Sequence, residues 1–202
     1  MTVPIIYPAI STTAALFWVW PNELSPELCQ DIIDRAGGDF EEGRLISEEG
    51  GGELDNDVRK TNLHFNSDQD LFDIAFEYME IANKNAKWNL EIDAAEDFQI
   101  GQFPVGGHYD WHIDGGGTGY FQDRQNKIRN GKTRKISMVV FLNEGFDGGD
   151  FEFHGSYLKD NVIKPTRGTI IMFPSWIMHR VTPITKGTRY SLVSWFLGKP
   201  IS

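Results

Sequence analysis

Two segments in the N-terminal part of the chain have apolar residues at helical spacing, and each is predicted to form a helix. A strand is predicted at residues 15–20, followed by a turn and a short helix. Ser25 suits the N-cap of that helix, Pro26 its first position, and Gly37 its C-terminal end. The strongest helical pattern is the stretch 67–88. Its apolar residues recur every three or four positions, at Leu71, Ile74, Ala75, Tyr78, Ile81 and Ala82.

Between these two helices, residues 41–60 are polar and rich in glycine, which predicts a surface loop or an edge hairpin. The short run 61–65 alternates between polar and apolar residues, as a strand does. From residue 97 onward the hydrophobic period is two, and Gly, Pro and Asn separate the segments. The predicted strands are 97–103, 108–114, 134–143, 148–155, 161–165, 168–174, 178–183 and 188–198.

So many short strands without intervening helices indicate an antiparallel sandwich or barrel, and a jelly roll is the first choice. The fold class expected is mainly β with helical N-terminal support. The length of 202 residues favours one domain over 1–202, with helical support at about 1–96 and a β core at about 97–198.

Composition narrows the classes of partner. The net charge of −10 disfavours nucleic acid and anionic membranes, because the overall field repels phosphates. Cys29 is the single cysteine and is expected to be a small core residue, so no internal disulfide can form. No apolar run reaches the ~18 residues of a membrane span, and the N-terminus lacks the basic region of a signal peptide. We therefore expect a cytoplasmic protein.

Candidate chemistry centres on the stretch HYDWHID at 108–114. On a strand, His112 and Asp114 project from the same face, while Ile113 is expected to point away into apolar surroundings. A lone His-x-Asp is weak evidence for a metal site. The other candidates for a third ligand are His64, His154 and His179.

His179 stands out because of the sequence that follows it. The segment 178–192 reads as two strands joined by a turn near residues 184–187. If the pairing centre lies near Ile184, His179 and Arg189 face each other across a hairpin. Arg189 and Ser191 are two positions apart and share a face. Two histidines and a carboxylate make the facial triad of non-haem Fe(II) oxygenases, and a guanidinium beside a hydroxyl suits a carboxylate.

These residues carry a family resemblance over residues 97–198, about half of the chain. The stretches HYDWHID, FDGGDFEF and GTIIMFPSWIMHRVTPITKGTRYSLVSWF resemble the Fe(II)- and 2-oxoglutarate-dependent dioxygenases. The likeness is to the prolyl-4-hydroxylase-like branch that includes the PKHD-type hydroxylases. The resemblance implies a double-stranded β-helix, and this agrees with the strand pattern.

The resemblance also implies roles for individual residues. His112, Asp114 and His179 would bind Fe(II), and Arg189, helped by Ser191, would hold the distal carboxylate of 2-oxoglutarate. Tyr109 matches a tyrosine of the branch that lines the pocket. The implied cofactors are Fe(II), 2-oxoglutarate and O₂, with ascorbate as a further candidate. One departure is Phe103, which stands where the family often has a tyrosine that contacts the co-substrate.

The implied reaction is hydroxylation of a C–H bond, coupled to decarboxylation of 2-oxoglutarate to succinate and CO₂. A peptidyl residue such as proline is the first choice of substrate. A free amino acid or another small molecule is an alternative, because the metal core would be identical. From a different class, a non-catalytic jelly-roll binding module stays open. Nucleic-acid demethylation is disfavoured by the charge and by the lack of a second arginine after Arg189 in the last strand.

The connection at 115–135 follows two of the candidate ligands directly. It begins with glycines and then carries Arg124, Lys127, Arg129, Lys132, Arg134 and Lys135. It is either a solvated loop or a lid that recruits an acidic substrate. His64 and His154 are expected to be structural, and His108 is expected to be a pocket or surface residue and not a ligand. Trp111, Trp176 and Trp195 are assigned to no site.

Overall fold

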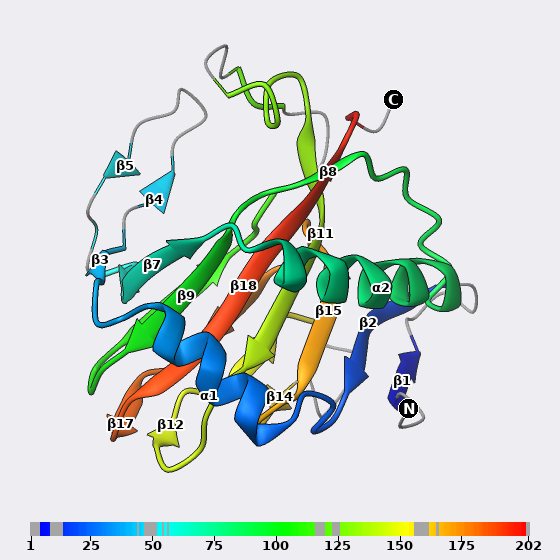
Figure 1. Cartoon of the computed structure of the whole chain (residues 1–202). Helices are drawn as coiled ribbons and strands as arrows, with labels where there is room; N and C mark the ends of the chain where they lie inside the picture. The colour runs from blue at the N-terminus through cyan, green and yellow to red at the C-terminus, as the bar shows by residue number, and fades with distance from the viewer. Residues whose placement is uncertain are drawn as a thin grey trace.

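The structure of the chain is a computed structural model. It describes residues 5–8, 14–43, 45–46, 52–53, 55, 57–115, 120–122, 126–155, 162–164 and 166–200. A large antiparallel main sheet runs through the molecule (Figure 1). Its strand order is β1 (Ile5–Pro8), β2 (Ala15–Trp20), β15 (Ile170–Pro174), β11 (Thr133–Phe141), β18 (Arg189–Gly198), β9 (Phe98–Phe103), β7 (Asn62–Asn66) and β3 (Glu41–Glu42), and β8 (Ala94–Ala95) also pairs with β18.

A second, minor sheet packs against one face of the main sheet. Its order is β14 (Val162–Ile163), β13 (Phe151–Phe153), β16 (His179–Val181), β10 (His108–His112) and β6 (Arg59–Lys60). The remaining strands form two separate pairs, β12 (Asp147–Gly148) with β17 (Ile184–Lys186) and β4 (Leu45–Ile46) with β5 (Gly52–Glu53). Phe17 of the main sheet stacks on Phe153 of the minor sheet, with ring centroids 4.5 Å apart. The predicted mainly β, jelly-roll class is confirmed.

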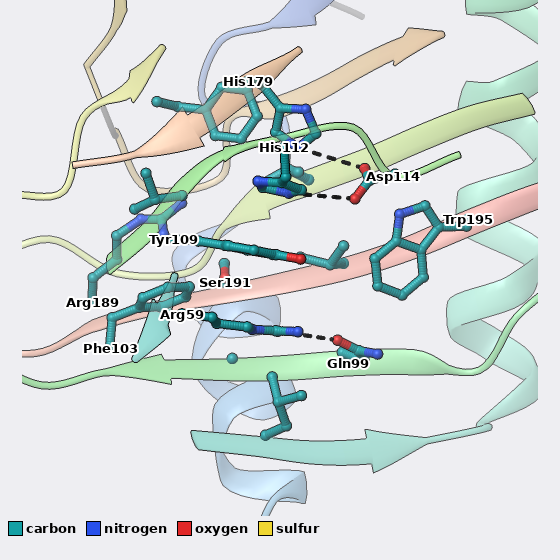
Figure 2. A pocket seen from close by; sticks show the side chains of 16 residues that line it. Arg59, Gln99, Phe103, Tyr109, His112, Asp114, His179, Arg189, Ser191 and Trp195 are labelled. Carbon is teal, nitrogen blue, oxygen red and sulfur yellow. Dashed lines mark hydrogen bonds and ion pairs between the residues drawn. The ribbon is translucent and has the colours of Figure 1, made fainter. Parts of the chain in front are cut away.

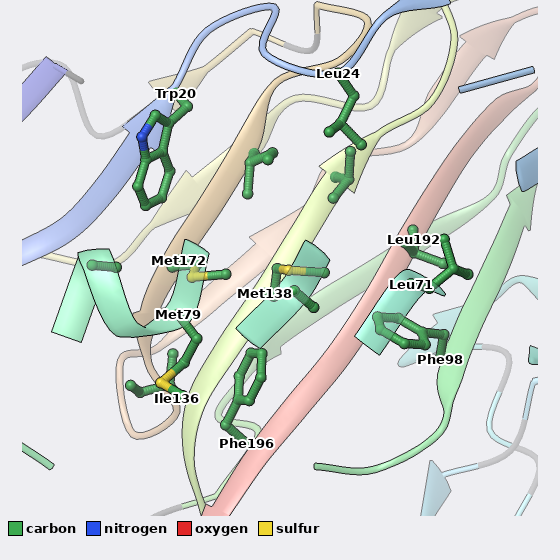
Figure 3. Close-up of a cluster of buried hydrophobic side chains, with 14 of the residues drawn as sticks. Trp20, Leu24, Leu71, Met79, Phe98, Ile136, Met138, Met172, Leu192 and Phe196 are labelled. Atoms are coloured by element: carbon green, nitrogen blue, oxygen red, sulfur yellow. The ribbon is translucent and has the colours of Figure 1, made fainter. Parts of the chain in front are cut away.

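Two helices cover the opposite face of the main sheet (Figure 1). They are α1 (Pro26–Arg35) and α2 (Gln69–Asn85), and the Ser25 hydroxyl caps α1 by accepting the Leu28 N–H, as predicted. Figure 3 shows Leu71 and Met79 of α2 in the apolar cluster that also contains Met138 and Phe196 of the sheet. Cys29 is fully buried in this cluster, as expected. Among the described residues, no helix has the length and apolar character needed to cross a membrane.

Side chains of a central strand point alternately to the two faces of the main sheet, and the two faces have different surroundings. On β18, Leu192 and Phe196 join the helix-side cluster. The alternate residues Arg189, Ser191 and Trp195 line a pocket between the sheets. Since side chains alternate across a strand, the same strand stabilises the helix layer and presents polar groups to the interior.

The N-terminal part contributes more than helical support. Strands β2 and β7 belong to the main sheet, and β6 belongs to the minor sheet, so both sheets recruit segments that precede residue 97. The polar stretch 41–60 contains the edge strand β3 and the β4–β5 hairpin, in agreement with its prediction as a loop or edge hairpin.

Two local expectations were wrong. Residues 178–192 do not form one hairpin, because β16 pairs with β10 and β13 in the minor sheet while β18 pairs with β9 and β11 in the main sheet. The turn strand β17 pairs with β12 instead. Ile113 does not enter apolar surroundings, since it is 52% exposed. Met178, which directly precedes β16, is exposed as well.

Candidate metal and co-substrate site

The predicted site residues come together in one pocket between the two sheets (Figure 2). The residues that line it include Tyr109, His112, Asp114, His179, Arg189 and Ser191. The first four come from the minor sheet and the loops beside it, and the last two come from β18. His179 and Arg189 therefore line one pocket from two different sheets and do not face each other across a hairpin.

His112, Asp114 and His179 form a compact cluster of potential ligands. One ligand atom from each lies within 4.8 Å of the others. The two Nε2 atoms are each 3.5 Å from an Asp114 carboxylate oxygen, His112 from Oδ1 and His179 from Oδ2. The antiparallel register of β10 and β16 sets His112 opposite His179, and the chain then carries Asp114 to the same side. This donor set fits a divalent iron ion with open positions.

Backbone carbonyls hold both imidazoles in the tautomer that a metal requires. The Nδ1 atom of His112 lies 2.7 Å from the Asp110 carbonyl oxygen, and that of His179 lies 2.9 Å from the Ile177 carbonyl oxygen. Because a carbonyl only accepts, Nδ1 carries the proton in each ring. The lone pair of each Nε2 is then directed toward Asp114 and is available for coordination.

Asp114 is held by hydroxyl groups from the neighbouring strands. Ser137 donates to Asp114 Oδ2 at 2.6 Å, and the Ser137 and Ser175 hydroxyls are 2.9 Å apart. The Asp114 N–H also donates to the Ser175 carbonyl at 3.0 Å. Both serine side chains are fully buried. The carboxylate is therefore oriented before any metal binds.

Charge states in the cluster suit metal binding. Burial alone would raise the pKa of Asp114, but His179, His112 and Arg134 outweigh it and hold that pKa well below its usual range. Burial lowers the pKa of His179 to about 4, although Asp114 opposes this. At neutral pH the cluster therefore offers a carboxylate and a neutral imidazole, the forms that coordinate metals.

Arg189 forms the other end of the site. It is fully buried, and none of its three guanidinium nitrogens has a hydrogen-bond partner among the described residues. Its Cζ atom lies 4.9 Å from the ring centroid of Phe103 and 5.1 Å from that of Phe141. Burial lowers its pKa to about 9. A buried cation without an anion is unfavourable, so this arrangement fits a ligand that brings a carboxylate.

Two glycines keep the surroundings of Arg189 open. A Cβ atom on Gly149 would lie 2.4 Å from Ile184 Cδ1 and 3.1 Å from Arg189 Cδ, and the φ of Gly149 is +68°. A Cβ atom on Gly101 would lie 3.2 Å from the Ser191 hydroxyl. A larger residue at position 149 would therefore crowd the guanidinium, and one at position 101 would crowd the Ser191 hydroxyl.

Residues 98–197 match the family model described as "2OG-Fe(II) oxygenase superfamily". The chain belongs to this superfamily. Its members use Fe(II), 2-oxoglutarate and O₂, and the predicted identification of the family is confirmed.

A curated relative resembles part of the sequence of this oxygenase-family chain. It is 36% identical to a PKHD-type hydroxylase from Picosynechococcus sp. over 83 residues, which are 40% of this chain and 37% of the relative. It therefore spans well under two thirds of that relative's length.

Solved structures match nearly the whole fold. The crystal structure of a Pseudomonas putida prolyl-4-hydroxylase has a TM-score of 0.64 at 20% identity, covering 90% of this chain and 92% of that one. A Trichoplax adhaerens prolyl hydroxylase, in complex with a hypoxia inducible factor peptide fragment, has a TM-score of 0.63 at 18% identity. That match covers 90% of this chain and 83% of that one.

Sequence reasoning missed several groups in the pocket of this oxygenase-family chain. Arg59, Gln99 and Trp195 line it, and Ser137 and Ser175 support Asp114. Trp195 shares the period of two with Arg189 and Ser191, and that alternation could have revealed it. Arg59 lies in a polar stretch without periodicity, so no sequence signal marked it as buried.

The other three histidines do not line the pocket, and none of them joins the ligand cluster, as expected. His108 contacts the carbonyl oxygens of Gly106 and Asp57 through its two ring nitrogens. His64 contacts the Asp39 carbonyl oxygen, and exposed His154 packs edge-on against Trp111. Phe103 occupies the pocket wall beside Arg189, at the position where the family often has a tyrosine.

Four of the six basic residues of the 115–135 connection are buried or form ion pairs with acidic residues. Arg134 and Lys135 are buried in β11, Arg134 and Arg129 pair with Glu96, and Lys132 pairs with Asp93. These four side chains are therefore not free to act in a basic lid, which was one of the two alternatives that the sequence left open. Arg124 and the glycines at 116–117 lie outside the described residues, so the lid itself stays a prediction.

Loss of the Arg134–Glu96 pair should strongly destabilise the protein. The Arg134 guanidinium makes two hydrogen bonds to Glu96, of 2.6 and 2.8 Å, and its Cζ lies 3.6 Å from the Trp195 ring centroid. Arg134→Ala would leave a buried carboxylate without its main partner, so we expect a loss of about 3 kcal/mol or more in the free energy of unfolding. Urea denaturation measures this loss.

Arg180→Ala is a matched control for the Arg134 change. Arg180 bonds Glu152 at 2.7 Å and lies over the Trp111 ring, but its side chain is 36% exposed against 8% for Arg134. Its loss should cost less than about 1 kcal/mol. Equal effects of the two substitutions would show that burial does not govern these pairs.

Proposed function

We propose that this chain is an Fe(II)- and 2-oxoglutarate-dependent dioxygenase that hydroxylates a C–H bond of a peptidyl residue, with proline as the first candidate. The observation that carries the proposal is the pairing of the His112–Asp114–His179 cluster with the unpartnered, buried Arg189 in one pocket. When bound, Fe(II) and 2-oxoglutarate would activate O₂ and couple decarboxylation to succinate and CO₂ with insertion of one oxygen atom into the substrate.

The residues of the chain divide this work between them. His112, Asp114 and His179 would hold Fe(II) on one side and leave its other positions open for the co-substrate and O₂. Arg189 would bind the distal carboxylate of 2-oxoglutarate, and Ser191, on the same face of β18, would add a hydroxyl. The rings of Phe103 and Phe141 beside Arg189 would exclude water and so strengthen the salt bridge between Arg189 and the carboxylate of 2-oxoglutarate.

Tyr109 would shape the wall of the reacting centre. Its ring stacks on the His112 imidazole, with centroids 3.5 Å apart and planes inclined by 11°. This contact limits rotation of the ligand ring and narrows the pocket. Burial raises the pKa of the Tyr109 hydroxyl, so the group remains a neutral hydrogen-bond donor at physiological pH.

Two observations support a peptidyl substrate. The matched relatives are named PKHD-type hydroxylases, and one structural neighbour is a prolyl hydroxylase in complex with a peptide fragment. A free amino acid or another small molecule is the second candidate, because the same metal and co-substrate geometry would serve it. A non-catalytic binding module is disfavoured, since all three ligand side chains and Arg189 are present.

An anaerobic absorbance titration tests the proposal. Addition of Fe(II) and 2-oxoglutarate to the metal-free protein should produce a visible charge-transfer band that requires both additions. A screen of proline-containing peptides, read by succinate formation, would then search for the substrate. If folded and metal-loaded protein gives no band at saturating 2-oxoglutarate, the co-substrate assignment is wrong.

Ser137→Ala should weaken metal binding by about 10- to 100-fold, because it removes the hydroxyl that orients Asp114. Competition between the protein and a chelator for Fe(II) measures the change. Ser194→Ala is the control, since Ser194 is equally buried but donates to the Glu96 carbonyl on another face of the sheet. Unchanged affinity in Ser137→Ala would mean that Asp114 needs no such support.

A further inference from the structure

Arg59 is a second buried guanidinium in the pocket, and the chemistry proposed above does not use it. It reaches the pocket from β6 and is 9% exposed. Its Nε atom has no hydrogen-bond partner among the described residues, and Nη2 makes one long bond of 3.4 Å to Gln99 Oε1. No carboxylate in the described part of the chain forms a salt bridge with it. Such a cation is unfavourable unless a ligand supplies the missing anion.

Arg59 and Arg189 belong to different parts of the pocket. Arg189 packs against Phe103 and Phe141, whereas the Cζ atom of Arg59 lies 4.7 Å from the ring centroid of Tyr109. Figure 2 shows Tyr109 between His112 on one side and Arg59 on the other. A short dicarboxylate held by the metal cluster and Arg189 leaves Arg59 free for a second molecule.

The groups around Arg59 offer donors in excess of acceptors. Figure 2 shows Arg59 directed toward Gln99, whereas the indole nitrogen of Trp195 lies on the side of Asp114. The indole N–H of Trp195 also has no partner among the described residues, although the ring is 5% exposed. The side-chain acceptor that Arg59 contacts among the described residues, Gln99 Oε1, is neutral. A planar anion with two acceptor oxygens would satisfy the Arg59 guanidinium through two parallel hydrogen bonds.

We propose that Arg59, with Gln99, forms a subsite for a carboxylate group of the main substrate. The inference rests on the proposed function, because it assumes that 2-oxoglutarate occupies the Arg189 end. It narrows the substrate class to amino acids or peptides with a free carboxylate near the hydroxylated residue. The carboxylate is either the C-terminal group itself or an acidic side chain next to that residue.

The subsite also explains how an acidic protein can accept an acidic substrate. The net charge of −10 repels anions at long range. Inside the pocket, however, Arg59 and Arg189 both lie within a low-dielectric interior where charge interactions are strong. Recognition would therefore depend on these local contacts and not on the overall field.

The test compares matched acids and amides in protein loaded with Zn(II), which is redox-inert, and saturated with 2-oxoglutarate. The first pair is N-acetylproline and N-acetylprolinamide, and the second is the amide-capped dipeptides acetyl-Pro-Glu and acetyl-Pro-Gln. Calorimetry measures their affinities. We expect the acid of at least one pair to bind about tenfold or more tightly than its amide. The pair that shows the preference distinguishes a terminal carboxylate from a side-chain one.

Arg59→Gln should abolish this preference, and Arg59→Lys should retain part of it by keeping the charge without the planar fork. Lys60→Gln is the matched control, because Lys60 is the exposed next residue and its change removes the same charge. The lysine variant and circular dichroism exclude misfolding as the cause. The preference should survive in Lys60→Gln.

Several results would overturn the subsite. They are equal binding of acid and amide in both pairs, a preference that persists in Arg59→Gln, or loss of 2-oxoglutarate binding in Arg59→Gln. The last result would place Arg59 in the co-substrate site. Failure of the wild-type protein to bind 2-oxoglutarate at all is a separate outcome, since it would contradict the proposed function first.

Discussion

Asp114→Asn should lower Fe(II) affinity and 2-oxoglutarate turnover by more than about 100-fold, since loss of groups that only support a ligand already costs 10- to 100-fold. The carboxamide keeps the size of the side chain and can still accept from Ser137. It lacks the negative charge that completes the set of two neutral imidazoles and one carboxylate. The effect should therefore arise from coordination and not from packing.

Chelator competition measures the metal affinity of Asp114→Asn, and succinate formation measures its turnover. Asp110→Asn is the matched control, because Asp110 lies four residues earlier on β10, is exposed and undergoes the same chemical change. Near-normal metal binding by Asp114→Asn, with the control unchanged, would remove Asp114 from the proposed ligand set.

Arg189→Met should have opposite effects on function and stability. Loss of the guanidinium removes the anchor for the distal carboxylate, so the KM for 2-oxoglutarate should rise by about 100-fold or more. In the ligand-free protein the same substitution replaces an unpartnered buried charge with an apolar side chain between Phe103 and Phe141. We expect the ligand-free protein to gain about 1–3 kcal/mol in unfolding free energy.

Urea denaturation with and without 2-oxoglutarate separates the two effects of Arg189→Met. Added 2-oxoglutarate should stabilise the wild-type protein, because it binds the folded state, and should not stabilise the variant. Arg167→Met is the control, since Arg167 is exposed and lies outside the pocket. A destabilised variant that still binds 2-oxoglutarate normally would show that Arg189 has a structural role.

Departures from the sequence-based expectations occur where pairing partners are distant along the chain. The segment 178–192 contains a turn that is typical of a hairpin, yet β16 and β18 join different sheets. Strands β12 and β13 arrive from an earlier part of the chain and pair with β17 and β16. Local turn chemistry cannot report such competition, because it depends on which strands the rest of the fold supplies.

The sequence by itself determined the local elements and the chemical identity of the site. The caps at Ser25 and Gly37 mark the first helix, and the change of period near residue 97 marks the β core, because local sterics and burial of one face act within a few residues. The spacing of Arg189 and Ser191 set both groups on one face of their strand. His112 and Asp114 reach the same side although the strand ends at His112 and Asp114 lies beyond it.

Only the tertiary structure decided which faces meet. It placed His179 of the minor sheet and Arg189 of the main sheet in the same pocket, and it left the Ile113 side chain exposed. It also buried Arg59 and engaged Arg134 with Glu96, although both arginines lie in polar stretches of sequence. Burial of a charged side chain depends on the layers that close around it, and those layers come from segments far apart in the chain.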